Sequence, residues 1–544
     1  MTDHLGRRPV LAPAVTALVA VLCFSAPAAA APPEPPHVLP GDAVASSVKA
    51  DRSRWIVGAR PGPESRAIAR RMGARSIGGS AWVVPARRAG RLAAALERAG
   101  VLTYSEPDRL SQRRQAVAAD PLSPQARWRD VVADPGLAPP PVTPTSPLLA
   151  LIDSRLDETH PEFGAGNVAT LGTQPLTDTH GTATAAVAAA PVNGVGIVGV
   201  WPGMRALNLP VPTQIRCSDS SSNINRAVSA GAAVINMSYG SASPCFAEYE
   251  QLQRATRAGV TLVAAAGNEL AAGNPLEFPA SLPHVLTVAA VGADLRATYF
   301  SNANAAVDLS APGEGILTAV PPAYDRDGRR DGYEAVDGTS FSAPMVSAAA
   351  AWVRAQRPEL TPDQVAQVVR LGARDVGRRG WEPSTGFGVL SVEGALRRKA
   401  PPEDPAEPND GIVWVDGRAF GAPARPLWRG RGVARRFGLL DRFEDPIDVF
   451  RVVVPARSSA RAVLSPRGGD PDLFVLPGTA RAIPTGARFQ RALVASSRRA
   501  GRRTDIVTWR NRSRKARTFY LFARVHAGSS SFDAAYDLTI RRAR

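Results

Sequence analysis

Residues 148–153, LLALID, place five apolar side chains directly before an aspartate. Strands that are apolar on both faces occur where helices cover both sides of a parallel sheet. Helix-like stretches separate this run from three later runs of the same kind, and we therefore predict an α/β domain with a doubly wound parallel sheet. The later runs are AAVIN (232–236), VTLVAAA (260–266) and VLTVAAV (285–291).

The composition fits a globular chain of several domains. The chain has 544 residues, of which 44% are hydrophobic, and this length predicts two or three domains. The net charge of +17 comes almost wholly from arginine. We expect the arginine clusters at 429–436 and 498–517 to form solvated or envelope-facing surface, and no specific nucleic-acid site.

The first thirty residues have the pattern of a secretion signal. Arg7 and Arg8 precede an apolar run from Val10 to Phe24, and small residues lead to an expected cleavage near Ala30. No later run approaches the roughly 18 apolar residues of a membrane span. We predict a secreted, extracellular protein without a membrane span; association with the cell envelope is also open.

Two cysteines remain in the exported chain. Cys23 leaves with the signal, so Cys217 and Cys245 enter an oxidising compartment as an even pair. We predict that they form a disulfide. Two buried thiols are the alternative.

The flanks of the α/β domain have patterns of their own. Residues 54–106 alternate strand-like and helix-like stretches, and this order predicts a small α+β sandwich. Proline-rich residues 135–147 predict an extended connector, and the charged, proline-rich residues 400–410 predict a linker. Beyond the linker, short runs of β-branched and aromatic residues predict an antiparallel β-sandwich.

Three groups with the chemistry of nucleophilic catalysis stand near predicted strand or helix ends. Asp153 follows LLALI, so its carboxylate is expected at the carboxyl edge of the sheet. His180 is a proton acceptor near neutral pH. Ser340 stands just before an apolar helix, where the helix dipole favours negative charge on the attacked carbonyl. We expect Pro344 in the first turn of that helix, where proline is tolerated.

A fourth group is an amide that follows another buried strand. Asn268 stands behind Gly267, which lets the backbone turn sharply, and an amide at this place can donate to an oxyanion. Gly181 and Gly338 are expected to clear space around the two reactive side chains.

Five segments in this order resemble the defining segments of the subtilisin-like serine proteases, the subtilases. The segments are LIDSRLDETHPEF (151–163), HGTATAAVAAA (180–190), VINMSYG (234–240), AAAGNE (264–269) and DGTSFSAPMVSAAAA (337–351). The order of acid, histidine and serine along the chain is the order known for subtilisin. The resemblance implies a serine endopeptidase that hydrolyses peptide bonds through an acyl-enzyme.

The resemblance also implies a role for each residue. Asp153 orients and stabilises the imidazolium of His180, which is general base and then general acid, and Ser340 is the nucleophile. Asn268 and the Ser340 backbone N–H bind the oxyanion. The walls of the primary specificity pocket are implied to come from Ser238, Tyr239, Gly240, Ala266 and Gly267.

The resemblance extends to both flanks and implies a self-processing zymogen. Residues 54–109 resemble the inhibitory pro-domain of secreted subtilases, with a ferredoxin-like fold and maturation by a cut between Leu110 and Asp120. The segments AEPND (406–410), DPIDVFRVVVP (445–455) and PDLFVL (471–476) resemble a pre-peptidase C-terminal β-sandwich. We therefore expect a signal peptide (1–30), a pro-region (31–119), a catalytic domain (120–399), a linker (400–412) and a β-sandwich (413–544).

The sequence departs from the family pattern at two positions. Arg155 stands where the family has glycine, and Ala183 stands where it has a second histidine. Arg155 either clashes with the substrate or points to solvent, and its effect on the rate is open. Glu269, which follows the oxyanion asparagine, is expected to favour basic side chains at the pocket rim.

Partners and cofactors follow from the same interpretation. We expect a monomer that acts on protein or peptide substrates, needs no cofactor and has its own pro-domain as inhibitor. A structural calcium ion is open: Asp448, Asp470 and Asp472 are candidate ligands, although solvent-exposed turn positions are the preferred interpretation. A non-catalytic binding protein on a protease scaffold is the main alternative. A lipase or esterase is disfavoured because G-x-S-x-G is absent from the sequence.

Overall fold

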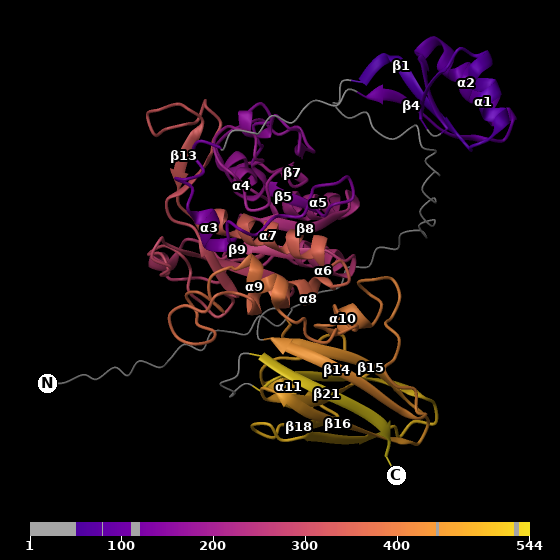
Figure 1. Cartoon of the computed structure of the whole chain (residues 1–544). Coiled ribbons are helices and arrows are strands. Elements are labelled where there is room, and N and C mark those ends of the chain that lie inside the picture. The colour runs from indigo at the N-terminus through magenta and orange to yellow at the C-terminus, as the bar shows by residue number, and fades with distance from the viewer. Residues whose placement is uncertain (1–49, 79, 110–119, 442–444, 527–532, 544) are drawn as a thin grey trace. The chain divides into compact units, whose positions relative to one another are not determined.

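A computed structural model describes residues 50–78, 80–109, 120–441, 445–526 and 533–543 (Figure 1). The chain divides into two compact units, one within residues 20–117 and one that contains residues 118–544. Three predictions lie outside the described residues: the signal peptide at 1–30 with Cys23, the start of the pro-region at 31–49, and the maturation cut within 110–119.

The N-terminal unit is a four-stranded antiparallel sheet with two helices. Its strands lie in the order β2-β3-β1-β4, and the chain order βαββαβ is that of a ferredoxin-like fold. The sequence pattern predicts every element except the short strand β2. The bounds are β1 (Ala50–Ala59), α1 (Pro63–Arg71), β2 (Arg75–Gly78), β3 (Ala81–Pro85), α2 (Ala86–Arg98) and β4 (Leu102–Arg109).

A seven-stranded sheet forms the centre of the second unit. Its order is β11-β10-β9-β8-β5-β7-β6, and every neighbouring pair is parallel. The predicted parallel sheet is therefore confirmed. The strands are β5 (Leu148–Asp153), β6 (Val168–Thr170), β7 (Ala206–Pro210), β8 (Ala232–Met237), β9 (Thr261–Ala265), β10 (Val285–Val291) and β11 (Leu309–Pro312).

Helices cover both faces of this sheet, and strand β5 shows why its residues are all apolar. Leu149 and Leu151 pack in one core with helices α4 and α7, whereas Ala150 and Ile152 pack in a second core with α5 and α6. The helices are α3 (Trp128–Val132), α4 (His180–Ala189), α5 (Cys217–Ser229), α6 (Phe246–Arg257), α7 (Thr339–Gln356), α8 (Pro362–Leu371) and α9 (Val392–Arg397).

Smaller elements complete this part of the chain. Strands β12 (Ile316–Ala319) and β13 (Tyr333–Val336) form an antiparallel pair, and Pro161–Phe163 and Leu270–Ala272 form short 3₁₀ turns. The predicted disulfide is present: Cys217 at the start of α5 is bonded to Cys245, the N-cap residue of α6, with their Cα atoms 6.1 Å apart. It joins the two helices on one face of the sheet.

Pro344 does not lie in the first turn of its helix, so that prediction is wrong. Helix α7 begins at Thr339, and Pro344 is its sixth residue. A proline at this position cannot donate to the carbonyl four residues earlier. That carbonyl belongs to Ser340, and it accepts a hydrogen bond from the Ser238 hydroxyl at 2.9 Å instead. The Ser238 side chain therefore replaces the missing helical donor.

The C-terminal part is a sandwich of two antiparallel four-stranded sheets around a shared core. Three of its strands, β14, β18 and β19, were not expected from the sequence. The sheets are β14-β21-β16-β19 and β15-β20-β17-β18, with β14 (Val433–Asp441), β15 (Ile447–Val454), β16 (Ser459–Gly468), β17 (Pro471–Pro477), β18 (Ala495–Ser497), β19 (Asp505–Arg510), β20 (Arg517–Val525) and β21 (Asp533–Arg542), and short helices α10 (Ile412–Val415) and α11 (Ala487–Ala492).

The preferred interpretation of the sandwich aspartates as solvent-exposed turn residues is wrong. Asp448, Asp470 and Asp472 have exposed fractions of 0%, 6% and 1%. Asp448 lies in β15 and Asp472 in β17, and their burial shows that both side chains point into the fold.

None of the described helices has the length and apolar character to cross a membrane.

Candidate catalytic site

The Asp153 carboxylate is buried at the end of β5 and held by three donors. Its Oδ1 atom lies 2.6 Å from Nδ1 of His180 and accepts the Ser154 backbone N–H at 2.7 Å. Its Oδ2 atom accepts the Thr184 hydroxyl at 3.0 Å. Because the side chain is only 2% exposed, the carboxylate has little freedom to turn away from the imidazole.

The start of helix α4 aims two side chains at this carboxylate. His180 is the first residue of α4, and Thr184 lies one turn later on the same helix face. Asp178 fixes the entry to the helix, because its Oδ1 atom accepts the His180 backbone N–H at 3.0 Å and the Ser154 hydroxyl. At Gly181, a β-carbon would overlap the Ser154 carbonyl, so only glycine permits this close approach.

The imidazole of His180 is tuned by these acidic neighbours. Burial alone would lower its pKa, but the charge and hydrogen bond of Asp153, together with the charge of Asp178, outweigh burial and hold the pKa above 6.5. The side chain is 34% exposed, so the edge of the ring away from Asp153 remains accessible. Such a ring can take up a proton from a group in front of it.

Ser340 is the second residue of helix α7, and the residue that follows it packs against His180. The ring of the next residue, Phe341, has its centroid 5.5 Å from the centroid of the His180 ring. The Ser340 hydroxyl donates weakly to the Ser238 carbonyl at 3.3 Å. Gly338 caps the helix with φ 146°, a backbone conformation that requires glycine; no atom is within 3.4 Å of a β-carbon there, so its role is conformation and not space.

Asn268 is exposed beside the same helix start. Gly267, with φ 101°, turns the chain sharply after β9, as expected. The Oδ1 atom of Asn268 accepts both the backbone N–H and the hydroxyl of Thr339, each at 3.0 Å. These two bonds orient the amide, so that its NH₂ group is the end left to donate to a ligand.

The implied pocket residues lie on two segments beside Ser340 and Asn268: Ser238, Tyr239 and Gly240 follow β8, and Ala266 and Gly267 follow β9. The Tyr239 hydroxyl donates to Glu248 at 3.0 Å, so this side chain points into the protein. Glu269 bends back, and its Oε2 atom accepts the Asn268 backbone N–H at 2.6 Å.

A second acidic residue of this region was missed by the sequence analysis. A β-carbon on Gly240 would lie 2.7 Å from the Oε2 atom of Glu277, and one on Gly267 would lie 2.7 Å from its Cγ atom. Glu277 is 7% exposed. Burial, and then the charge of Glu269, raise the pKa of Glu277. Its contact with the two wall segments arises from folding over residues 269–277, and no local motif announces it.

The two departures from the family pattern have clear positions. The Arg155 guanidinium donates to the carbonyls of Gly172 and Gln174 at 3.5 and 3.2 Å, and lies 3.4 Å from Glu158. It therefore holds the loop before α4, which neither of the two expected alternatives described. Ala183 is fully buried, and its carbonyl accepts the Thr318 hydroxyl at 2.9 Å.

Comparisons with known proteins indicate the family of the chain. The profile of the subtilase family matches residues 145–388. Fervidolysin of Fervidobacterium pennivorans is 28% identical over 314 residues, or 51% of this chain and 44% of fervidolysin. Subtilisin E of Bacillus subtilis is 30% identical over 259 residues, or 46% of this chain and 65% of that protein. The chain thus spans about half to two thirds of these relatives.

Solved structures are similar as well. The crystal structure of fervidolysin aligns with a TM-score of 0.47 and 18% identity over 84% of both chains. The prenylagaramide maturation protease PagA aligns with a TM-score of 0.41 and 28% identity, over 46% of this chain and 92% of that one.

Subtilisin of Bacillus pumilus is 30% identical over 259 residues, which cover 46% of this chain and 90% of that protein. The chain therefore belongs to the subtilase family of serine proteases.

Proposed function

We propose that this protein is a secreted serine endopeptidase that cleaves peptide bonds through an acyl-enzyme. The observation that carries the proposal is the buried Asp153 carboxylate 2.6 Å from Nδ1 of His180, with the ring packed against the residue after Ser340. Asn268, oriented by Thr339, is the fourth part of this catalytic group. The role of each residue rests on its match to the family motif.

In the acylation step, the Ser340 Oγ atom attacks the peptide carbonyl carbon while His180 accepts the hydroxyl proton. The Asp153 carboxylate stabilises the resulting imidazolium. The carbonyl oxygen becomes an oxyanion, which Asn268 Nδ2 and the Ser340 backbone N–H stabilise by hydrogen bonds. The first N–H groups of helix α7 lack helical acceptors, so this donor is available. Collapse of the intermediate breaks the C–N bond, and His180 gives its proton to the leaving amine.

In the deacylation step, water replaces the amine. His180 removes a proton from the water as it attacks the ester carbonyl of the acyl-enzyme, and the same oxyanion donors act again. The C–O bond to Ser340 then breaks, the proton returns to Ser340, and a new carboxyl terminus is released. The net reaction is hydrolysis, which consumes one water molecule.

Casein hydrolysis by the purified proteins tests the activity. We expect wild type to release peptides, Ser340→Ala to lose this activity, and the exposed Ser243→Ala to retain it as a matched control. A binding protein without catalysis would give three equally inactive samples. Activity that persists in Ser340→Ala would remove this serine from the mechanism.

The substrate class is proposed to be peptides with Lys or Arg before the scissile bond. Glu269 and Glu277 bring two carboxylates to the implied walls of the primary pocket, against Gly240 and Gly267. A basic side chain that enters between these walls would pair with the buried Glu277 charge, and a charge-assisted bond of this kind is strong. An acidic side chain would be repelled.

Peptide p-nitroanilides that differ only in the residue before the cut test this preference. We expect a higher kcat/KM for Arg and Lys than for Phe, and we expect Glu277→Gln to reduce the Arg-to-Phe ratio by about tenfold or more. Glu250→Gln, an exposed change on α6, is the matched control. An unchanged ratio in Glu277→Gln would contradict the pocket assignment while leaving the proposed catalysis intact.

Secretion and self-processing are proposed from the N-terminal segments. The signal-like residues 1–30 support export, and the ferredoxin-like unit, which resembles subtilase pro-domains, supports an intramolecular inhibitor. We expect Ser340→Ala to accumulate as an uncleaved precursor, and N-terminal sequencing of secreted wild type to place its start between Leu110 and Asp120. Normal processing of purified Ser340→Ala would argue against self-maturation.

A further inference from the structure

Five carboxylates gather where the linker meets the sandwich. Asp404, Glu407 and Asp410 lie in the linker, and Asp445 and Asp448 lie at the start of β15. We refer to these five residues as the carboxylate cluster. Each residue of the cluster interacts electrostatically with at least one other member.

The cluster contains buried oxygen atoms that lack donors. The side chains of Glu407 and Asp410 are 4% and 2% exposed, and Asp448 is fully buried. Among the residues that the structure describes, one oxygen atom of each carboxylate in the cluster is buried without a hydrogen-bond partner. Folded proteins pair nearly all buried polar atoms, and an unpaired charged one is costly. Five unpaired carboxylate oxygens in one place therefore indicate that a positive group belongs there.

The spacing of three carboxylates in the cluster fits a metal ion. Ligand atoms of Asp404, Glu407 and Asp448 all lie within 4.8 Å of one another. Two oxygens that each bind one calcium ion at 2.3–2.6 Å can be at most about 5 Å apart. The other oxygens of these carboxylates are already fixed by donors: Asp404 by the Ala406 N–H, Glu407 by the Asn409 N–H, and Asp448 by the Tyr536 hydroxyl.

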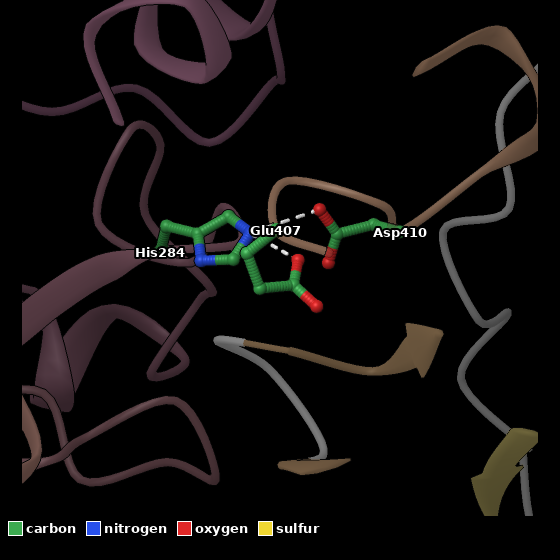
Figure 2. A group of neighbouring side chains, drawn as sticks. All are labelled: His284, Glu407 and Asp410. Carbon is green, nitrogen blue, oxygen red and sulfur yellow. Dashed lines mark hydrogen bonds and ion pairs between the residues drawn. The ribbon is translucent and has the colours of Figure 1, made fainter. Parts of the chain in front are cut away.

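His284 closes one side of the cluster and joins it to the α/β domain. Figure 2 shows its ring directed at Asp410 and Glu407. Its Nε2 atom lies 3.0 Å from Asp410 and 3.4 Å from Glu407, and its Nδ1 atom lies 3.0 Å from Asp363. Since each ring nitrogen faces a carboxylate, His284 serves as a donor to both sides and leaves no lone pair for a metal.

The positive charge within the described residues does not balance the cluster. Among the described residues, the strongest electrostatic interactions of the cluster involve two cations, His284 and Arg436. These two cations are fewer than the five carboxylates of the cluster. The carboxylates thus repel one another strongly.

We propose that a calcium ion binds the carboxylate cluster, with Asp404, Glu407 and Asp448 as its central ligands, and ties the β-sandwich to the α/β domain through Asp410 and His284. An all-oxygen ligand set with several carboxylates suits Ca²⁺, and the lack of thiolate and of a free imidazole disfavours Zn²⁺. The site is independent of the proposed peptidase activity.

Calorimetric titration of the full-length chain tests the proposal. Ser340→Ala is the parent, so that self-digestion cannot confuse the result, and every sample is first freed of metal with EDTA. We expect the parent to bind one more Ca²⁺ than Glu407→Gln or Asp448→Asn, with weak heat from MgCl₂. At 100 times its Kd, calcium should raise the parent's Tm by about 5 °C more than that of either variant.

Two comparisons separate a lost site from a damaged fold. In EDTA, Asp448→Asn should melt at or above the Tm of the parent, because one buried negative charge is gone and the Tyr536 hydroxyl still has an acceptor. Asp537→Asn, an exposed change beside Arg467 in the sandwich, should bind calcium like the parent. Equal calcium stoichiometry in parent and cluster variants, or preferential binding of ZnCl₂, would overturn the proposal.

Discussion

At the scale of single residues, the orientation of His180 is the feature on which the chemistry depends. Both carboxylate oxygens of Asp153 accept hydrogen bonds from donors that include His180 and Thr184. The Asp178 carboxylate accepts the backbone N–H of His180 and so fixes the start of helix α4. A fixed ring needs less reorganisation when it accepts the serine proton. The negative neighbours also make the ring a stronger base than free histidine.

The pH dependence of kcat/KM follows from the raised pKa of His180. General-base catalysis needs the neutral ring, so activity should rise with pH and reach half its maximum above pH 6.5. In Asp178→Asn, one negative charge near the ring is removed and the pKa falls, so the midpoint should move to lower pH. A pH series with one p-nitroanilide checks this, and a midpoint that stays in place or rises would contradict it.

Asn268→Ala should lower kcat about 10²- to 10³-fold with little change in KM, because its amide meets the oxyanion only in the transition state. This magnitude was measured in subtilisin, a member of this family, and is carried over by analogy. Asn274→Ala, whose side chain bonds Ala303 outside the proposed site, is a control for loss of an amide. A folded Asn268→Ala with an unchanged kcat would refute the oxyanion role.

The residues proposed to react could be predicted from the sequence because each stands near the end of a recognisable element. Asp153 ends one apolar strand, Asn268 follows another, and Ser340 is the second residue of an apolar helix. The supporting residues were missed for different reasons. Thr184 lies four residues after His180, a spacing that could have revealed it, whereas Glu277 reaches the pocket walls only through tertiary folding.

At the scale of elements, helix α7 is unusual because it carries a proline in its second turn, four residues after Ser340. The helix persists because Ser238, from the segment after β8, donates to the Ser340 carbonyl. The segment after β8 and helix α7 are thereby joined by this hydrogen bond. The sequence pattern predicted the helix but not this exchange of a backbone donor for a side-chain donor.

A double-mutant cycle tests the link between Ser238 and Pro344. Ser238→Ala leaves a partly buried carbonyl without its donor and should reduce the free energy of unfolding by about 0.5–1.5 kcal/mol. Pro344→Ala restores the helical N–H, so Ser238→Ala should cost less in that background. Urea unfolding of the four proteins measures the coupling. Strictly additive free energies would contradict the proposed substitution of donors.

The disulfide between Cys217 and Cys245 should stabilise the pair α5 and α6. It closes a loop with a sequence separation of 28, for which the loop-entropy relation gives about 3–4 kcal/mol. We therefore expect Cys217→Ser/Cys245→Ser to lower the Tm clearly and to leave kcat almost unchanged, because neither cysteine lies in the catalytic group. Thermal melts and p-nitroanilide kinetics of the same preparation decide this; an unchanged Tm would count against it.

At the scale of the whole molecule, the second unit combines the parallel sheet with the antiparallel sandwich. Long apolar runs predicted the sheet because both of its faces are covered. Strands such as β14, with arginines among its residues, were missed because their pattern is weak. Residues 400–410 were expected to be a charged, proline-rich linker. Asn409 and Asp410 within it are buried, because contacts distant in sequence decide their environment.

The central claim is that Ser340 is a nucleophile activated by His180, and covalent labelling tests it most directly. Purified secreted protein is treated with diisopropyl fluorophosphate, digested and analysed by mass spectrometry. The account predicts one phosphoryl adduct, on Ser340, in wild type and a greatly reduced adduct in His180→Ala. Absence of the adduct from folded, processed wild type, or equal labelling in His180→Ala, would contradict it.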